Sequence, residues 1–295
     1  MIDGSGCIRN AISRLLPDGD TAAPLAIVDR FAEELARYAE VIVGPGGRPV
    51  GFMTRGEGPL FTDRVSAALA SLDMPTEARA HQSALASWFE HKRGFFKVEW
   101  HERPLAAVYF RRRPPIAYVL GRLESWGVPA AARARALSVA ATLQKNSVHF
   151  VSAAFRPGRE IHHKLYFSQW VTASTRADVA RRIGGVFELY GIGPEAREAW
   201  AANHERCLGE EDSTLFVSMS CSSRELPPSF KIDYPGLQPE IAADWLPHER
   251  RAAAIADGER ARTLAGSQRL TFVGVRFSSD RLEPELKYYC DVPHR

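Results

Sequence analysis

Polar and apolar residues alternate most clearly in the stretch EIHHKLYF, at positions 160–167. Successive side chains of a strand point to opposite faces, so this stretch predicts a strand with one apolar and one polar face. The predicted polar face carries His162, Lys164 and Tyr166.

The spacing of lysine and tyrosine recurs later in the chain. In ELKYYC, Lys287 and Tyr289 share a face, and in the weaker copy SFKIDY, Lys231 shares a face with Asp233. A lysine is seldom buried without a partner. Lysines at one place in three hairpins therefore indicate either a solvated sheet face or a shared anionic ligand.

The whole chain repeats one pattern five times: helix, proline break, helix, strand, turn, strand. The breaks lie at Pro17, Pro75, Pro129, Pro194 and Pro247. The predicted helices cover residues 7–16, 24–38, 62–72, 77–91, 116–126, 130–144, 176–190, 195–207, 240–245 and 248–264. The predicted strands cover residues 40–43, 49–54, 95–101, 105–111, 148–155, 160–167, 214–221, 229–234, 269–277 and 285–291. A repeat of supersecondary units is a strong guide to architecture.

Five consecutive hairpins predict an α+β fold in which ten antiparallel strands close into a barrel ringed by helices, with residues 1–295 as a single domain. Closure removes the exposed sheet edges. The outer face must be apolar to receive the helices, and the predicted outward residues are Leu165, Phe167, Phe230, Ile232 and Leu286. Ten strands make a barrel wider than side chains alone fill, so a polar lumen is expected.

Composition and charge indicate which partners and which cellular compartment to expect. A net charge of +3 is too small to predict a nucleic-acid partner. The four cysteines show no metal-ligand spacing, which favours a reduced, cytoplasmic protein. The first 20 residues have no apolar run of a signal peptide, and no stretch is apolar enough for a membrane span, so we expect no membrane partner.

The predicted lumen gathers cations and phenols, which together suit several phosphate oxygens. By strand parity the lumen-facing residues are Tyr109, Arg111, Ser152, His162, Lys164, Tyr166, Ser218, Lys231, Asp233, Arg276, Lys287 and Tyr289. The sequence contains no glycine-rich phosphate loop and no DDxxD cluster for a magnesium-bridged diphosphate. We therefore expect side chains, and no metal site, to hold the anion, with Mg²⁺ at most stimulating the reaction and no cofactor required.

With these features the sequence resembles the aromatic prenyltransferases of the ABBA, or PT-barrel, class. The resemblance covers the whole chain and rests on the five repeats and the Lys-x-Tyr pairs Lys164/Tyr166 and Lys287/Tyr289. It implies an enzyme that transfers a prenyl group from a prenyl diphosphate to a nucleophile inside the barrel. The second hairpin departs from the pattern, because Ala107 stands where a lysine is expected and Arg111 is its possible substitute.

In length and layout the chain looks most similar to the bacterial cyanobactin prenyltransferases, which modify cyclic peptides. This resemblance implies Glu40 as the catalytic base and Arg55 as a diphosphate ligand. If Phe52 points inward, a bulge is needed to turn Arg55 inward, and Arg48 is the alternative. The complete set of implied diphosphate-binding residues is Arg55, Arg111, Lys164, Tyr166, Lys231, Arg276, Lys287 and Tyr289.

Several assignments stay open at this point. Tyr109 and Trp100 are candidates to shield an allylic cation through cation–π contact. Glu99 competes with Glu40 as the base, although its strand parity points it away from the lumen, and His162 could be a second base. The expected donor is dimethylallyl or geranyl diphosphate. The acceptor is a peptide, or alternatively a small indole or phenol, and a non-catalytic barrel that binds an anionic lipid or nucleotide is a third interpretation.

Overall fold

A computed structural model describes residues 4–15, 21–47, 50–90, 93–100, 103–158, 161–208, 212–221, 229–281 and 283–293. The strands are β1 (Ala39–Val43), β2 (Val50–Gly56), β3 (Gly94–Trp100), β4 (Pro104–Phe110), β5 (Phe150–Phe155), β6 (His162–Val171), β7 (Ser213–Cys221), β8 (Ser229–Pro235), β9 (Phe272–Ser278) and β10 (Glu285–Asp291). The helices are α1 (Gly4–Leu15), α2 (Ala22–Arg30), α3 (Ala32–Arg37), α4 (Gly58–Ser71), α5 (Thr76–Trp88), α6 (Ile116–Ser125), α7 (Ala130–Thr142), α8 (Arg176–Leu189), α9 (Pro194–Cys207), α10 (Pro239–Ala243) and α11 (His248–Ala265), with a short 3₁₀ helix η1 (Pro45–Gly47).

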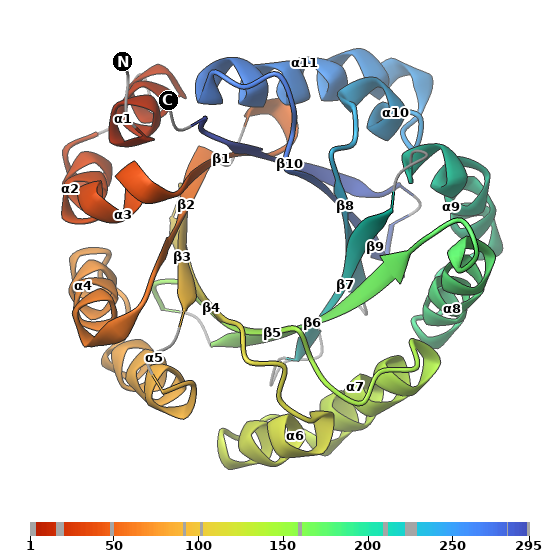
Figure 1. Ribbon diagram of the computed structural model, residues 1–295, viewed down its shortest axis with the longest axis horizontal. Coiled ribbons are helices and arrows are strands. Elements are labelled where there is room, and N and C mark those ends of the chain that lie inside the picture. Colours follow the sequence, from red (N-terminus) through yellow and green to blue (C-terminus); the bar gives the residue numbers. More distant parts are fainter. Residues whose placement is uncertain are drawn as a thin grey trace.

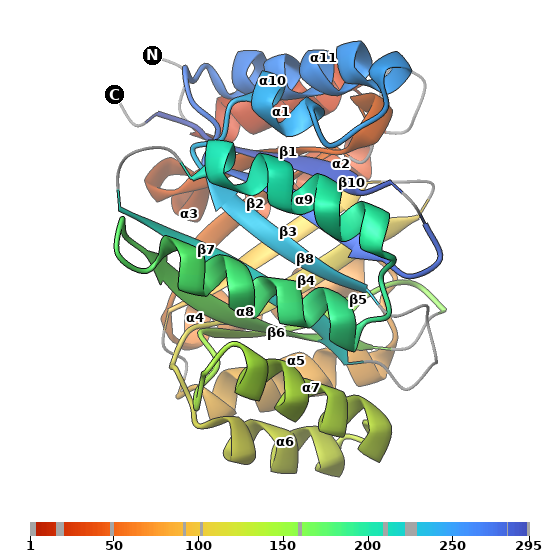
Figure 2. The same cartoon turned by 90° about the vertical axis from the view of Figure 1, so that its right-hand side faces the viewer.

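The ten strands form one closed antiparallel barrel in which each strand pairs with its neighbours in sequence. The last strand closes on the first, where Glu40 lies opposite Asp291 and Ile42 opposite Tyr289. The helices lie around the outside of this barrel (Figure 1). Figure 2 shows the same helices from the side, each lying against the outer face of the strands. The α+β barrel expected from the repeats is therefore confirmed.

The layer between helices and barrel is the hydrophobic core. All five residues predicted to face outward belong to it, namely Leu165, Phe167, Phe230, Ile232 and Leu286. Burial of such side chains contributes about 1.5–3 kcal/mol each relative to exposure. The helices therefore stabilise the barrel from outside and leave the inner face to other chemistry.

Most helix boundaries fall where the prolines predict. Pro75, Pro129 and Pro247 stand immediately before α5, α7 and α11 in an extended conformation, with ψ of 149°, 148° and 151°. Pro194 is the first residue of α9, where its missing N–H needs no partner. Pro17 lies outside the described residues.

Several predicted elements differ in extent from the observed ones, and two of these differences have a clear structural reason. The single helix expected over residues 24–38 is two helices, because the backbone leaves the helical region at Phe31 with φ −108° and ψ 19°. Strand β6 continues to Val171, beyond the predicted end at Phe167, because it pairs with β7 as far as Ser213. In the described part of the chain, no helix combines the length and the apolar character needed to span a membrane.

Candidate active site

The register of the barrel decides which side chains reach the lumen. Glu40 pairs with Met53, and both line the internal pocket. Phe52 therefore points the other way, into the outer core, where its ring lies 5.8 Å from that of Trp100. The prediction of Trp100 as a cation-shielding residue is wrong, because its side chain packs outside the barrel.

The same register corrects two neighbouring expectations. Glu99 faces the lumen, since side chains alternate along β3 and Trp100 faces out. Arg55 follows Met53 by two residues on an uninterrupted ladder, so it shares the lumen face without any bulge. Its guanidinium lies 5.0 Å from the centre of the Tyr38 ring. Arg48 lies outside the described residues.

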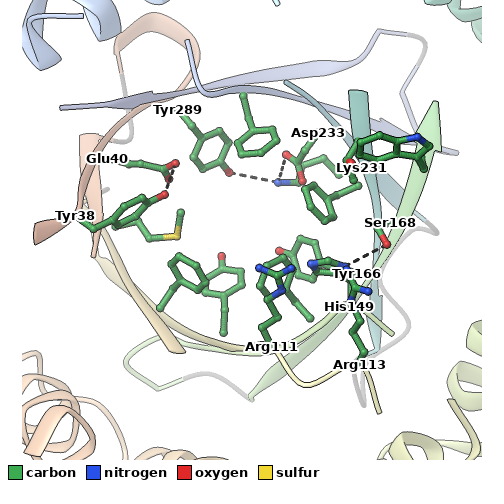
Figure 3. Close-up of a pocket in the computed structure, with 18 of the residues that line it drawn as sticks. Tyr38, Glu40, Arg111, Arg113, His149, Tyr166, Ser168, Lys231, Asp233 and Tyr289 are labelled. Atoms are coloured by element: carbon green, nitrogen blue, oxygen red, sulfur yellow. Dashed lines mark hydrogen bonds and ion pairs between the residues drawn. The ribbon is translucent and has the colours of Figure 1, made fainter. Parts of the chain in front are cut away.

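The lumen holds a pocket of about 580 Å³ (Figure 3). It is lined by Tyr38, Glu40, Met53, Phe95, Tyr109, Arg111, Arg113, Lys145, His149, Phe150, Tyr166, Ser168, Trp170, Thr214, Phe216, Lys231, Asp233, Phe272 and Tyr289. This volume lies within the range of pockets that take small organic molecules. Most of the lining comes from the end of the barrel opposite the hairpin turns, and we call this end the mouth.

An aromatic belt encircles the pocket. It consists of Tyr38, just before β1, and of Phe95, Phe150, Phe216 and Phe272 from β3, β5, β7 and β9, so each repeat contributes one ring. Successive ring centres lie 5.8, 5.8, 5.7 and 5.8 Å apart. These are contact distances for aromatic pairs. The belt gives the pocket an apolar, π-rich wall that suits a flat aromatic ligand or an allylic cation.

Three tyrosines from second strands lie beside the belt, together with one lysine. The rings of Tyr109 and Tyr166 are 5.7 Å apart. The ammonium of Lys231 lies 5.1 Å from the ring centre of Tyr289 and 5.9 Å from that of Tyr166. It also donates to the Tyr289 hydroxyl at 3.4 Å and pairs with Asp233 at 2.7 Å. The tyrosine faces therefore already accommodate a positive charge.

Glu99 is the centre of an ion-pair network deeper in the lumen. Its carboxylate accepts from the Lys97 ammonium at 2.8 Å and from that of Lys287 at 2.9 Å to each oxygen. The Glu99 side chain is 1% exposed. Burial lowers the pKa of Lys287 to about 8, with Lys97 and Lys231 acting in the same direction and Glu99 opposing them.

Lys164 faces the same interior without a carboxylate at ion-pair distance among the described residues. Burial lowers its pKa well below the ordinary value, and the charges of Lys97, Lys231, Arg276 and Lys287 lower it further. We call these five side chains the basic cluster. An ammonium surrounded in this way by other cations is held at a high electrostatic cost, which an anionic ligand would relieve.

Of the predicted cationic diphosphate ligands, Lys164, Lys231, Lys287 and Arg276 belong to this cluster, and Arg111 and Arg55 do not. Arg276 lies near the hairpin end of β9, where its guanidinium bonds the Ser229 hydroxyl at 3.1 Å. Arg111 follows β4 at the mouth and lines the pocket. Arg55, at the mouth end of β2, lies against Tyr38. The structure thus brings the four lysines and Arg276 together but separates Arg111 and Arg55 from them.

Glu40 belongs to β1, which pairs with β10 on one side and with β2 on the other. It is fully buried, and the Tyr38 hydroxyl donates to its Oε1 at 2.7 Å. Burial raises the pKa of Glu40 well above its ordinary value, and the cross-strand neighbour Asp291 raises it further. Glu40, when ionised, is therefore a stronger base than an exposed glutamate.

The mouth carries a second group of basic side chains, namely Arg111, Arg113, Lys145 and His149. His149 bonds the Ser168 hydroxyl at 3.2 Å, and its burial, with the three neighbouring cations, lowers its pKa to about 4. The backbone of Arg113 has φ +55°, a left-handed conformation uncommon for residues other than glycine. Such conformations concentrate at ligand sites.

Sequence reasoning missed the aromatic belt, Lys97 and the role of Tyr38. One signal was present, since HFVSAAF, LFVSMSC and TFVGVRF share a phenylalanine at the second position. These residues are Phe150, Phe216 and Phe272, three members of the belt. Lys97 gave no such signal, because the reading of Trp100 as inward placed its whole strand on the wrong face.

Among the residues that the structure describes, no group of three or more histidine, cysteine, aspartate or glutamate side chains is arranged to hold a metal ion. No protein-family model matches the chain. No curated protein matches it in sequence either.

Solved structures do resemble this chain over nearly its whole length. NotF in complex with brevianamide F and DMSPP superposes with a TM-score of 0.66 at 14% identity, covering 97% of this chain and 92% of NotF. AnaPT from Neosartorya fischeri gives 0.62 at 13% identity, covering 99% and 92%. The prenyltransferase PriB, in a ternary complex with L-tryptophan and dimethylallyl thiolodiphosphate, gives 0.58 at 14% identity, covering 98% and 96%. The chain therefore has the PT-barrel fold of these prenyltransferases.

Proposed function

We propose that this protein transfers a prenyl group from a prenyl diphosphate to an indole or other small aromatic acceptor inside its barrel. The observation that carries the proposal is Lys164, an enclosed ammonium surrounded by cations and supplied with no described carboxylate at ion-pair distance. Three solved structures of two proteins with this fold, PriB and NotF, are described with diphosphate or a thiolodiphosphate compound, which supports the same interpretation.

The charge balance of the lumen favours a diphosphate ligand. The cations of the basic cluster are Lys97, Lys164, Lys231, Lys287 and Arg276, and the carboxylates paired with them are Glu99, Asp233 and Glu285. Five cations against three carboxylates leave an excess of two positive charges when all groups are ionised. A prenyl diphosphate supplies several negative oxygens in one compact group, and charge-assisted hydrogen bonds to them are the strong kind.

The reaction follows from this arrangement. The bond between the allylic carbon and the diphosphate oxygen breaks, the bonding pair leaves with the diphosphate, and the basic cluster stabilises the departing charge. The allylic cation lies against Tyr109, Tyr166 and Tyr289, whose ring faces favour positive charge. The acceptor's nucleophilic atom forms the new bond to the allylic carbon, and the Glu40 carboxylate takes the proton that this atom releases.

The acceptor site in this proposal is the apolar space inside the aromatic belt. A flat ring can stack there with one edge toward Glu40 on the β1 wall. Arg111, Arg113 and His149 lie on the β4 and β5 side of the mouth, across the pocket from Glu40 (Figure 3). These cations suit an acceptor whose far end carries a negative group.

A peptide acceptor, as in the cyanobactin prenyltransferases, is the second candidate. The observation in its favour is the open mouth, where Trp170 at the rim is 59% exposed. The neighbours described with brevianamide F and L-tryptophan favour the smaller acceptor.

The proposal is tested by incubating the protein with dimethylallyl or geranyl diphosphate and matched panels of indole, phenol and peptide acceptors. Product is read as the mass increase of the acceptor by one prenyl group. Transfer to an indole or phenol supports the proposal, and transfer to peptides alone supports the second candidate. Diphosphate binding without transfer to any acceptor indicates a non-catalytic binding barrel.

A further inference from the structure

The contact between Glu99 and Lys287 crosses the lumen. Glu99 belongs to β3 and Lys287 to β10, and the barrel order places β1 and β2 between those strands. Both carboxylate oxygens nevertheless lie 2.9 Å from the Lys287 ammonium. This ion pair is therefore not an ordinary cross-strand neighbour contact but a bridge through the space inside the barrel.

Glu99 presents two anionic oxygens to two lysines of the basic cluster. One oxygen is shared, since Lys97 also donates to Oε1 at 2.8 Å. A carboxylate that gathers two ammonium groups in this way makes the same contacts that two oxygens of a phosphate group would make. Glu99 thus engages the cations that the proposed function assigns to the diphosphate.

Resting on the proposed function, we propose that Glu99 is an internal competitor of the diphosphate. Glu99 pairs with Lys97 and Lys287 before the donor binds, releases them to the incoming prenyl diphosphate, and pairs with them again as inorganic diphosphate leaves. No covalent step is involved, because Glu99 only exchanges ion pairs. Glu99 is a positioning residue in this account, since it acts through the two lysines.

Two consequences follow for binding and turnover. The donor must displace Glu99 from its two lysines, so the affinity of the barrel for the donor is lower than it would be without Glu99. The diphosphate product no longer carries a prenyl chain held against Tyr109, Tyr166 and Tyr289, and it competes for the two lysines with Glu99, which is part of the barrel wall. Glu99 therefore accelerates product release at the expense of diphosphate affinity.

A purely structural role for Glu99 predicts the opposite change in diphosphate affinity when Glu99 is replaced. In that case Glu99 fixes the two lysines in the geometry that diphosphate needs, and its loss weakens binding. The variant Glu99→Gln keeps the shape of the side chain and removes its charge. A competitor role therefore predicts that Glu99→Gln binds diphosphate more tightly than the parent, and a structural role predicts that it binds more weakly.

The experiment measures the dissociation constant of inorganic diphosphate by calorimetry, and its inhibition constant in the prenyl-transfer assay, for the parent and for Glu99→Gln. We expect Glu99→Gln to bind inorganic diphosphate about tenfold to a hundredfold more tightly, the effect of one or two charge-assisted contacts, and to turn over more slowly because the product is retained. Glu124→Gln removes a charge from the exposed surface of α6, and its affinity should equal that of the parent.

Removing a buried carboxylate can also impair folding, because two lysines lose their partner. The double variant Glu99→Gln/Lys97→Met removes one of those lysines, and it should bind inorganic diphosphate more tightly than Lys97→Met alone. Equal or weaker binding in both comparisons overturns the role of Glu99 and leaves the proposed function intact. Failure of the parent itself to bind inorganic diphosphate or a prenyl diphosphate overturns the proposed function.

Discussion

The Tyr38 hydroxyl donates a hydrogen bond of 2.7 Å to Glu40, and the Tyr38 ring also belongs to the aromatic belt and lies under the Arg55 guanidinium. One side chain therefore links the proposed base to the wall of the acceptor site. Because Glu40 is fully buried, this hydroxyl fixes the direction of its carboxylate from within the protein.

Replacing Glu40 should separate catalysis from donor binding. Glu40→Gln keeps the shape and should lower kcat by about a hundredfold or more, the usual size of a general-base contribution, with the dissociation constant of the prenyl diphosphate unchanged. Tyr38→Phe keeps the ring and should have a smaller effect on kcat. Rate and calorimetry measured on the same preparations check this prediction, and equal losses of donor affinity and kcat in Glu40→Gln would argue that Glu40 helps to hold the donor instead.

The raised pKa of Glu40 also predicts a pH dependence of stability. Its folded-state pKa lies above the ordinary value of 4.5, so the folded protein binds this proton more tightly than the unfolded chain does. The stabilisation is present below pH 4.5 and is lost as pH rises through the folded-state pKa. Glu40→Gln should therefore unfold at a higher denaturant concentration than the parent above that pKa, with the difference vanishing in acid. A parent that stays the more stable at high pH would show that ionised Glu40 is well accommodated.

Diphosphate binding should be coupled to proton uptake. The pKa of Lys287 is lowered to about 8, so this ammonium is partly deprotonated above pH 8 in the empty barrel. A bound diphosphate raises the pKa again and draws a proton from the buffer. Calorimetry at pH 8.5 in buffers of different ionisation enthalpy should show net uptake, which should fall in Lys287→Met. Binding heats that do not depend on the buffer would contradict the coupling.

The overall fold could be predicted from the sequence because its signals are local. The prolines at positions 75, 129, 194 and 247 stand at the starts of helices, and the alternating strands separate apolar from polar faces. The outward face of β6, with Leu165 and Phe167, is decided by that alternation alone. The repetition then predicts the barrel, because five consecutive hairpins form a closed sheet once the last strand pairs with the first.

The site was less predictable, because it depends on contacts between distant strands. Strand β3 has aromatic residues at both parities, Phe95 toward the lumen and Phe96 and Trp100 toward the core. Its pattern could not show which face was inside, so Lys97 was missed and Glu99 was expected to point away from the lumen. The bridge from Glu99 to Lys287 joins residues 188 positions apart, which no local pattern reports.

The mouth should influence which acceptors are used. Lys145→Met removes a cation from the pocket lining and leaves the basic cluster unchanged. We expect KM to rise about fivefold to tenfold for indole-3-propionate, because a charge-assisted contact contributes about 1.5–3 kcal/mol and part of it is screened at the mouth. KM for indole-3-propionamide should not change. A shift of the same size for both compounds would show that Lys145 does not recognise charge.

The central claim is that the basic cluster holds the diphosphate of the donor, and Lys164 tests it most directly. The measurement is the calorimetric dissociation constant of dimethylallyl diphosphate in EDTA for the parent, Lys164→Met and Lys145→Met. The account predicts binding by the parent without Mg²⁺, a loss of about tenfold to a hundredfold in Lys164→Met, and parent-like affinity in Lys145→Met. Parent-like affinity in Lys164→Met, or donor binding by the parent only when Mg²⁺ is restored, would contradict it.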